Sequence, residues 1–420
     1  MYFSTKSVHN VFLYSIGIHL SRFILKIAGY FNSKLRQGQK GRARTFQRLE
    51  SSIQPLDKTL WFHCASLGEY EQGLPVFTAL KTLYPSHKIV LSFFSPSGYE
   101  IRKHAPIADV VVYLPLDTRS HAKRFLNQVH PDLIVFVKYE IWPHFLLEAQ
   151  QRNIKSILIS ALFRENQLYF KPYGGFMRKA LFTFNHIFTQ NLASKQLLEH
   201  IGYTRASVSG DTRFDRVFQQ LNQDNSLPFV ATFKQNNLCV VAGSTWPEDE
   251  VLFVEYIHAL KRNDIKFILA PHTLHPAKIN RLKNAFGEKA ILFSERAQAN
   301  LSQYQVLIVD TIGLLSKIYS YADLAYVGGA MGTSGLHNTL EPAVFGIPIV
   351  IGKNYKNFPE AHDMLASGGM LSVKNKGEFN HSLNTLLADP ILMKSLGAKN
   401  FDYIKKNTGA VIQILNYLRI

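Results

Sequence analysis

The chain contains an apolar run that ends in two glycines, Leu324-Ala325-Tyr326-Val327-Gly328-Gly329, and soon afterwards the stretch Gly335-Leu336-His337-Asn338-Thr339-Leu340-Glu341-Pro342. The first pattern is typical of a buried strand, and the second predicts a glycine turn that opens a helix. Glycines let the backbone approach a ligand closely, and a helix N-terminus offers unpaired N–H groups to a phosphate. Asn338 and Glu341 lie three residues apart, so an amide and a carboxylate can meet the same sugar hydroxyls. The motif therefore indicates a nucleotide-sugar site, although similar turns in many α/β proteins only reverse the chain.

Short apolar runs recur along the chain and alternate with segments of helix length. Such Val/Ile/Leu-rich runs are typical of buried parallel strands. They cover residues 60–64, 89–93, 110–113, 133–137, 157–160 and 186–189 in the first half, and 239–243, 267–270, 306–309, 324–327 and 347–351 in the second. A polar stretch at 219–226 separates the halves. We therefore predict an α/β protein with two Rossmann-like domains, 51–215 and 230–420, that face one cleft beyond the carboxyl ends of their strands.

The composition excludes several classes of site. The 420 residues are 46% hydrophobic and 18% charged, which is enough to fill two cores. The two cysteines, Cys64 and Cys239, lie in apolar runs, so we expect neither disulfides nor a cysteine-rich metal site. No Walker A, HExxH or CxxC motif occurs, and the acidic run 248–250 has no evident metal-binding partner. We expect a mechanism without a metal or cofactor.

The net charge of +17 is concentrated near the N-terminus, where residues 1–50 hold nine Lys/Arg and one acidic residue. Within the apolar segment 11–31, polar or small residues recur every three or four positions, at Ser15, His19, Arg22, Lys26 and Gly29. This spacing predicts an amphipathic helix in a bilayer interface, with its basic stripe toward anionic head groups. A buried core helix and a spanning or signal segment are the alternatives. We interpret residues 1–50 as a membrane-anchoring segment.

Glu69 follows the run 60–64 directly, in Ala65-Ser66-Leu67-Gly68-Glu69, where a glycine turn opens a helix. A helix N-terminus favours an ionised carboxylate, and such a group within reach of a sugar hydroxyl can act as a general base. The alternative is a first-turn glutamate that only complements the helix dipole.

Two other strand ends carry charges. Lys138 and Glu140 lie in Lys138-Tyr139-Glu140-Ile141-Trp142-Pro143, and they form either a structural ion pair under a tryptophan or a cluster that positions an anionic substrate. Arg213, near the predicted domain boundary, can offer two N–H groups to a carboxylate or phosphate. His272 follows a strand of the second half, where both a structural and a ligand-binding role are open.

Taken together, these motifs resemble the 3-deoxy-D-manno-octulosonic acid (Kdo) transferases of lipopolysaccharide synthesis. The order and spacing agree over nearly the whole chain, at His63 to Glu69, Glu140 to Pro143, Ser209 to Asp215, Gly313, and Gly335 to Pro342 followed by Asn357-Phe358. The resemblance implies a GT-B glycosyltransferase fold, attachment to the cytoplasmic face of the inner membrane, and inverting transfer of Kdo from CMP-Kdo to a lipid A precursor.

The resemblance also implies roles for single residues. Glu69 takes the place of the proton acceptor. The positions where the family holds CMP are Pro271, His272, Ile312, Gly313, Leu314, Asn338, Thr339, Leu340 and Glu341.

The chain departs from the family pattern at three positions. Lys138 stands where the family has an acid, Arg213 where it has lysine, and Leu314 where it has glutamate. We expect Lys138 to pair with the Kdo carboxylate or a lipid A phosphate, Glu140 partly to replace the missing acid, and Arg213 to stabilise the departing CMP.

Two other functions remain open from the sequence. The chain can be another GT-B enzyme that uses a UDP-sugar. A nucleic-acid-binding protein fits the pI of about 9.6, but no recognition motif for nucleic acid occurs. We therefore expect CMP-Kdo, a lipid A precursor and an anionic membrane surface as partners, and no nucleic acid.

Overall fold

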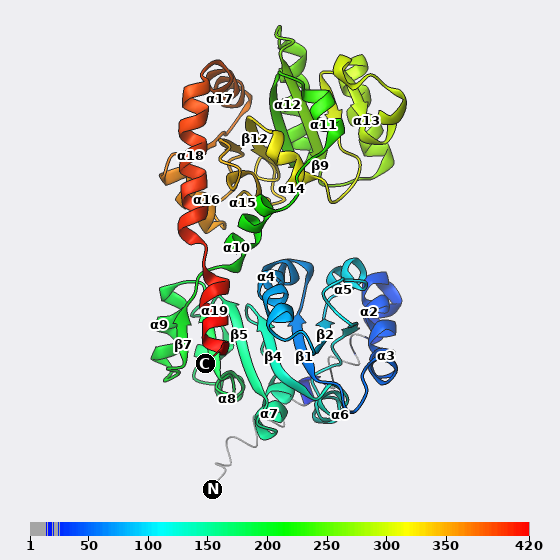
Figure 1. Ribbon diagram of the computed structural model, residues 1–420, viewed down its shortest axis with the longest axis vertical. Coiled ribbons are helices and arrows are strands. Elements are labelled where there is room, and N and C mark those ends of the chain that lie inside the picture. Colours follow the sequence, from blue (N-terminus) through cyan, green and yellow to red (C-terminus); the bar gives the residue numbers. More distant parts are fainter. Residues whose placement is uncertain (1–13, 15, 19, 21–23, 25, 420) are drawn as a thin grey trace. The chain divides into compact units, whose positions relative to one another are not determined.

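The computed structural model describes residues 14, 16–18, 20, 24 and 26–419 (Figure 1). These residues form two compact units. The first extends to Arg216 and takes in the chain again from Thr408, and the second comprises Val217–Asn407.

The first unit is built on a seven-stranded sheet with the order β3-β2-β1-β4-β5-β6-β7, and all its pairings are parallel. Its strands are β1 (Thr59–Cys64), β2 (Lys88–Phe93), β3 (Val110–Tyr113), β4 (Pro131–Val137), β5 (Lys155–Ala161), β6 (His186–Thr189) and β7 (Ala206–Val208). The six predicted runs are strands. The sequence analysis missed only the seventh, β7, whose three residues Ala-Ser-Val are too short and too polar for a recognisable apolar run.

Helices cover both faces of this sheet: α2 (Ser33–Ala43), α3 (Thr45–Ser52), α4 (Leu67–Leu83), α5 (Pro96–Arg102), α6 (Arg119–Val129), α7 (Pro143–Gln151), α8 (Gly175–Leu181), α9 (Leu192–His200) and α10 (Thr212–Phe218). The alternation of side chains along β1 separates two cores. Trp61 packs with Phe125 and Phe136 in one core, and Phe62 stacks on Phe77 of α4 in the other. Because both faces are buried, the strands consist mainly of apolar residues.

The last helix of the chain, α19 (Ala410–Arg419), belongs to the first unit. Ile414 is fully buried in the core that lies beside α4, and Asp215 accepts the backbone N–H of Gly409 at 3.0 Å. The sequence analysis had included this helix in the second domain, 230–420. Its amphipathic pattern shows that one face is buried, but not which sheet buries it.

The second unit contains another seven-stranded parallel sheet, with the order β10-β11-β9-β8-β12-β13-β14. Its strands are β8 (Leu238–Thr245), β9 (Ile265–Pro271), β10 (Ala290–Leu292), β11 (Val306–Ile308), β12 (Leu324–Val327), β13 (Ile349–Ile351) and β14 (Met370–Ser372). The five predicted runs are strands. The short edge strands β10 and β14 were not predicted.

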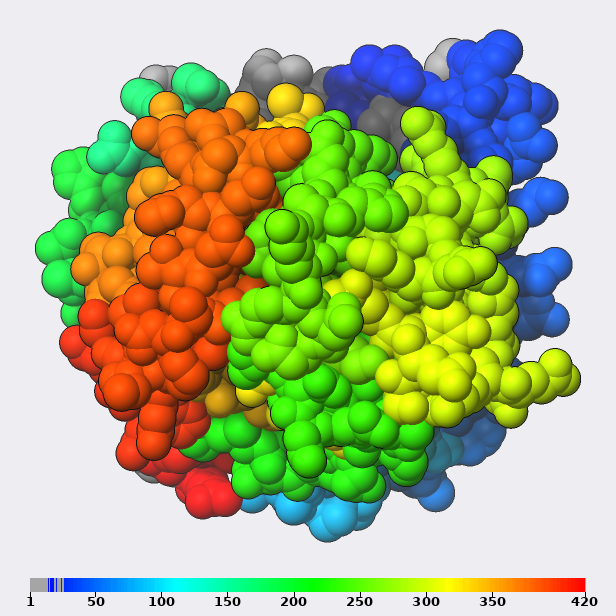
Figure 2. All heavy atoms as spheres, turned by 90° about the horizontal axis from the view of Figure 1, so that it is seen from above, coloured from blue at the N-terminus to red at the C-terminus, as the bar shows by residue number. Residues whose placement is uncertain are grey.

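Eight helices of the described chain accompany this sheet: α11 (Pro228–Lys234), α12 (Pro247–Ala259), α13 (Pro276–Phe286), α14 (Leu315–Ile318), α15 (Leu340–Ala343), α16 (Pro359–Ala366), α17 (Lys376–Ala388) and α18 (Pro390–Asn407). Figure 2 shows α17, α12 and α13 side by side on one face of the unit. β8 lies between β9 and β12 in the sheet. The strands β9 to β11 are added on one side of β8 and the strands β12 to β14 on the other, so the direction of strand addition reverses at β8. Such a switch point is where open parallel sheets bind ligands.

The predicted N-terminal helix is described only in part. Residues 1–13, 15, 19, 21–23 and 25 lie outside the described residues, so the basic stripe predicted within 11–31 stays a prediction. Of the helical residues that are described, Ile24 is 55% exposed, Ile27 47% and Phe31 89%. Within the described part of the chain, no helix is both long and apolar enough to cross a membrane.

Candidate active site

Glu69 lies in the first turn of α4, directly after the carboxyl end of β1. Its residue is only 6% exposed, and its Oε2 accepts hydrogen bonds from the backbone N–H groups of Ala65 and Ser66, the latter at 3.2 Å. Burial, and next the charge of Glu140, raise the pKa of Glu69 to about 7, although the backbone N–H groups and Lys138 act in the opposite direction. A carboxyl with a pKa near neutrality is matched to general-base chemistry. The same contacts also make Glu69 a cap of its own helix.

Glu140 is bound by the indole N–H of Trp142 and lies near the imidazole of His63. Trp142 Nε1 donates to Glu140 Oε2 at 2.9 Å, and His63 Nε2 lies 3.4 Å from the same oxygen. His63 is fully buried, and its Nδ1 lies 2.8 Å from the hydroxyl oxygen of Ser92. The indole N–H of Trp142 therefore orients the carboxylate of Glu140.

Lys138 occupies the end of β4 in a left-handed conformation, with a φ of 70°. Its ammonium lies 5.3 Å from the centre of the Tyr139 ring, and no ion pair between Lys138 and Glu140 is found among the residues that the structure describes. The structural ion pair considered from the sequence is therefore not formed. Lys138 instead acts on Glu69, whose pKa its charge lowers.

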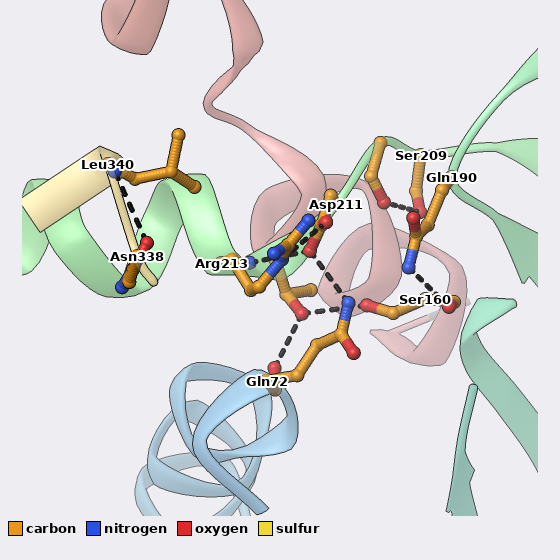
Figure 3. A network of polar contacts seen from close by, with 10 residues as sticks. Gln72, Ser160, Gln190, Ser209, Asp211, Arg213, Asn338 and Leu340 are labelled. Carbon is orange, nitrogen blue, oxygen red and sulfur yellow. Dashed lines mark hydrogen bonds and ion pairs between the residues drawn. The ribbon is translucent and has the colours of Figure 1, made fainter. Parts of the chain in front are cut away.

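Arg213 is oriented by its neighbour Asp211 (Figure 3). Arg213 Nε donates to Asp211 Oδ2 at 2.8 Å, and the Arg213 backbone N–H donates to Oδ1 at 2.9 Å. Gln72 of α4 donates to the same Oδ1 at 2.7 Å, and Thr212 donates to the backbone oxygen of Gln72. Because Gln72 lies three residues after Glu69, one helix supports both the candidate base and the candidate guanidinium.

The second unit carries its predicted ligand-binding residues on the loops that follow β9, β11 and β12. Asn338 Nδ2 donates to Glu341 Oε1 at 3.0 Å, so this amide and carboxylate share one face. Ser316 donates to the other oxygen of Glu341, also at 3.0 Å. Asn338 Oδ1 accepts the backbone N–H of Leu340 at 3.2 Å. The expected helix after the glycine turn is short, because α15 holds only Leu340–Ala343.

The other predicted CMP contacts lie on three loops. Pro271 is the buried last residue of β9, and the exposed His272 follows it. Gly313 adopts a φ of 89°, which glycine tolerates best, between the 80% exposed Ile312 and the start of α14 after Leu314. Thr339 is almost completely buried, with its hydroxyl against the Met364 sulfur. Thr339 can therefore offer a ligand only its backbone.

Asp249 is a residue whose role the sequence did not reveal. It is fully buried at the start of α12, where Oδ1 accepts the hydroxyl of Tyr326 at 2.6 Å. Its Oδ2 accepts the N–H groups of Trp246 and Gly329, each at 2.9 Å. One carboxylate thus ties the end of β8 to the end of β12. Its position four residues after the end of β8 was the only available signal.

A cavity of about 360 Å³ lies between α12 and α13. Trp246 and Pro271 form part of its wall, and Val251, Val254 and Leu282 contribute apolar surface. Pro271 is the one predicted CMP contact among the described residues that line it. The cavity is therefore not the predicted nucleotide site, which lies along the loops. Among the residues described, no group of three His, Cys, Asp or Glu side chains is arranged to hold a metal ion.

Comparison with known proteins finds relatives that match most of the chain. Residues 38–216 match the family model of 3-deoxy-D-manno-octulosonic-acid transferases (kdotransferases). Over 383 residues the chain is 28% identical to the 3-deoxy-D-manno-octulosonic acid transferase of Haemophilus influenzae, an alignment that covers 87% of each chain. The chain is therefore similar to Kdo transferases over most of its length. A second relative with the same name, from Aquifex aeolicus, is 28% identical over 345 residues, which cover 81% of this chain and 89% of that one.

Solved structures confirm the predicted fold. The UDP-GlcNAc 2-epimerase of Neisseria meningitidis bound to UDP-GlcNAc superposes with a TM-score of 0.60 at 16% identity, over 87% of this chain and 100% of that chain. A glycosyltransferase from Rickettsia africae gives a TM-score of 0.55 at 15% identity, over 86% of this chain and 98% of the other. At these identities the likeness shows the fold alone, which is that of the two-domain GT-B proteins.

Proposed function

We propose that this protein moves Kdo from CMP-Kdo to a lipid A precursor, with inversion at the anomeric carbon and without a metal or cofactor. The observation that carries the proposal is the buried carboxyl of Glu69 at the end of β1, within the stretch that matches the family. Its pKa of about 7 leaves a large fraction ionised at neutral pH.

In the proposed reaction, Glu69 accepts the proton of the acceptor hydroxyl. The freed oxygen attacks the anomeric carbon of Kdo, and the bond from that carbon to the phosphate oxygen breaks. CMP leaves with the electron pair, and the proton passes from Glu69 to solvent. Glu140, oriented by the N–H of Trp142, supplies negative charge that stabilises positive charge developing on the sugar.

The cationic residues serve the anionic groups of both substrates. Lys138 attracts the Kdo carboxylate or a phosphate of the acceptor, and Arg213 stabilises the departing phosphate of CMP. The fixed orientation of Arg213 on Asp211 supports this role, because a pre-oriented guanidinium loses less entropy when it binds. The Asn338 and Glu341 pair is suited to the ribose hydroxyls.

We further propose attachment to the cytoplasmic face of the inner membrane. The exposed apolar side chains at Ile16, Leu20, Ile24 and Ile27 recur every three or four residues and support a lipid-facing stripe. Lys34 and Lys40 of α2 follow closely in the chain and suit anionic head groups.

The test is a single incubation of the full chain with CMP-Kdo, generated in place, and a tetraacylated lipid A precursor, followed by mass spectrometry of the lipid. One or more Kdo mass increments, absent with Glu69→Gln, are the expected result. No increment from folded protein that binds CMP would contradict the proposed substrates. Thermal protection by UDP instead of CMP would favour a UDP-sugar enzyme.

A further inference from the structure

Three aromatic rings meet at the ends of the adjacent strands β9, β8 and β12. Trp246 and His337 lie nearly in one plane, with ring centres 6.4 Å apart and 16° between the planes. His272 stacks on Trp246 with ring centres 4.9 Å apart, and it lies tilted by 33° against His337 with ring centres 4.4 Å apart. The predicted CMP contact His272 is therefore supported by two residues to which neither the sequence nor the family resemblance assigned a role.

The contact between Trp246 and His337 fixes where the imidazole carries its proton. Trp246 Nε1 lies 3.0 Å from His337 Nε2, and an indole N–H can only donate. His337 Nε2 must therefore be unprotonated. Burial, and next the charge of His272, lower the pKa of His337 to about 4, so the ring is neutral near pH 7. A neutral ring whose Nε2 accepts a hydrogen bond carries its proton on Nδ1.

Glycines hold His337 in this position. The His337 backbone N–H donates to the Gly328 oxygen at 3.2 Å, so the loop folds back onto the end of β12. Gly329 has a φ of 93°, and an added Cβ there would lie 2.1 Å from the Gly335 oxygen and 3.0 Å from His337 Cδ2. The Cδ2 edge of the ring is thus packed against Gly329, and Nδ1 lies on the opposite edge.

The Nδ1–H group is a donor without an acceptor in the described protein. The half-buried His337 forms hydrogen bonds through Nε2 and its backbone N–H, and no described residue accepts from Nδ1. Asn338, the next residue, bonds Leu340 and Glu341, and it occupies the part of the loop predicted to bind CMP. A fixed neutral donor at this place suits an anionic oxygen, because hydrogen bonds to charged groups are the stronger ones.

We propose that His337 is a further donor-binding residue, which donates its Nδ1–H to a phosphate oxygen of a nucleoside 5′-monophosphate sugar, and that Trp246 is the positioning residue that sets this tautomer. The inference rests on the proposed function, since it assigns the phosphate of CMP-Kdo to this donor. The hydroxyls of the ribose remain with Asn338 and Glu341.

The first test is nitrogen NMR of the full chain labelled with ¹⁵N-histidine, in which the His337 signals are identified by their loss in His337→Gln. The proposal expects a protonated Nδ1 and an unprotonated Nε2, and a shift of the proton toward Nε2 in Trp246→Phe. CMP should move the Nδ1 resonance, whereas cytidine should not. A proton on Nε2 in the wild-type protein, or an equal response to cytidine, would overturn the proposal.

The second test is the affinity for CMP by calorimetry. Trp246→Phe keeps the stacking ring and removes only the N–H, so it should weaken CMP binding several-fold, and His337→Gln by about ten- to a hundredfold. His381→Gln, an exposed histidine of α17, is the matched control and should bind CMP like the wild type. Unchanged affinity in both site variants would overturn the inference.

The two proposals fail in different ways. Kdo transfer with normal CMP affinity in Trp246→Phe and His337→Gln would refute the role of His337 and leave the function intact. CMP binding that perturbs Nδ1, without any Kdo transfer, would refute the proposed substrates and leave the role of His337 intact.

Discussion

The carboxyl ends of the two sheets differ in the chemistry they present. At the first sheet, the carboxyl of Glu69 is buried and next to a second carboxylate, so its pKa lies far from the usual range. At the second sheet, the loops carry the half-buried neutral imidazole of His337 and the amide of Asn338 with its partner Glu341, and the buried Asp249 only ties the loops together. A buried carboxyl with a raised pKa suits proton transfer, whereas fixed neutral donors suit binding. We infer that the first unit provides the chemistry and the second holds the donor.

The largest expected effect is that of Glu69→Gln. The amide cannot accept the proton, so the rate of Kdo transfer should fall by about 10²–10⁴-fold, while the affinity for CMP stays within twofold. Single-turnover kinetics and calorimetry measure the two quantities. If CMP binding is lost together with activity, the division between the sheets is wrong.

Asp249→Ala tests the role of the second sheet in holding the donor. The change leaves the buried hydroxyl of Tyr326 and two backbone N–H groups without their acceptor, which should cost roughly 2–4 kcal/mol of unfolding free energy. Because the ends of β8 and β12 separate, CMP affinity should fall as well. Denaturant unfolding and calorimetry provide the readout, with the exposed Glu248→Ala as the control. Normal CMP affinity in Asp249→Ala would show that the loops hold their geometry without this carboxylate.

Asp211→Asn weakens the orientation of Arg213. We expect kcat to fall about tenfold with little change in CMP affinity, because the guanidinium is needed most as the phosphate departs. Asp264→Asn is a close control, since Asp264 pairs at 2.7 Å with Arg262, also two residues away, but on the exposed surface. Equal losses in the two variants would mean that the effect is not specific to the site.

Trp142→Phe should have the smallest effect. It removes the 2.9 Å hydrogen bond to Glu140 but keeps a ring against Phe94, so we expect a loss of about 1 kcal/mol in transition-state stabilisation. Steady-state kinetics should show a fall in kcat of about fivefold. A larger fall, accompanied by a lower melting temperature, would indicate a packing role for the indole.

The sequence predicted the central strands because their residues are apolar on both faces, as in Leu60 to Cys64 of β1. It missed β7, β10 and β14, because a three-residue strand at the edge of a sheet is too short to show a repeating pattern of apolar residues. The helix α19 was assigned to the wrong sheet, because an amphipathic pattern shows that one face of a helix is buried but does not show which sheet it packs against. Glu69 was recognisable from its place after a strand and from the family resemblance.

Contacts between distant residues were beyond prediction. The hydrogen bond from Trp246 joins it to a histidine 91 residues later, and that of Gln72 reaches 139 residues along the chain. Each hydrogen bond depends on which strands are neighbours in the sheet, and a local sequence pattern does not show this. Likewise, a raised pKa of Glu69 follows from burial and from Glu140, and neither is visible in the motif around Glu69.

The central claim is that Glu69 is a base whose pKa is raised by its surroundings, and the pH dependence of kcat/KM for Kdo transfer tests it most directly. Since the base must be ionised, kcat/KM should rise with pH through about 7 in the wild type. In Glu140→Gln the repulsion from Glu140 is gone, so the pKa of Glu69 falls and the rise should move to lower pH. A rise at the same pH in both proteins, or one near the ordinary glutamate pKa in the wild type, would contradict the account.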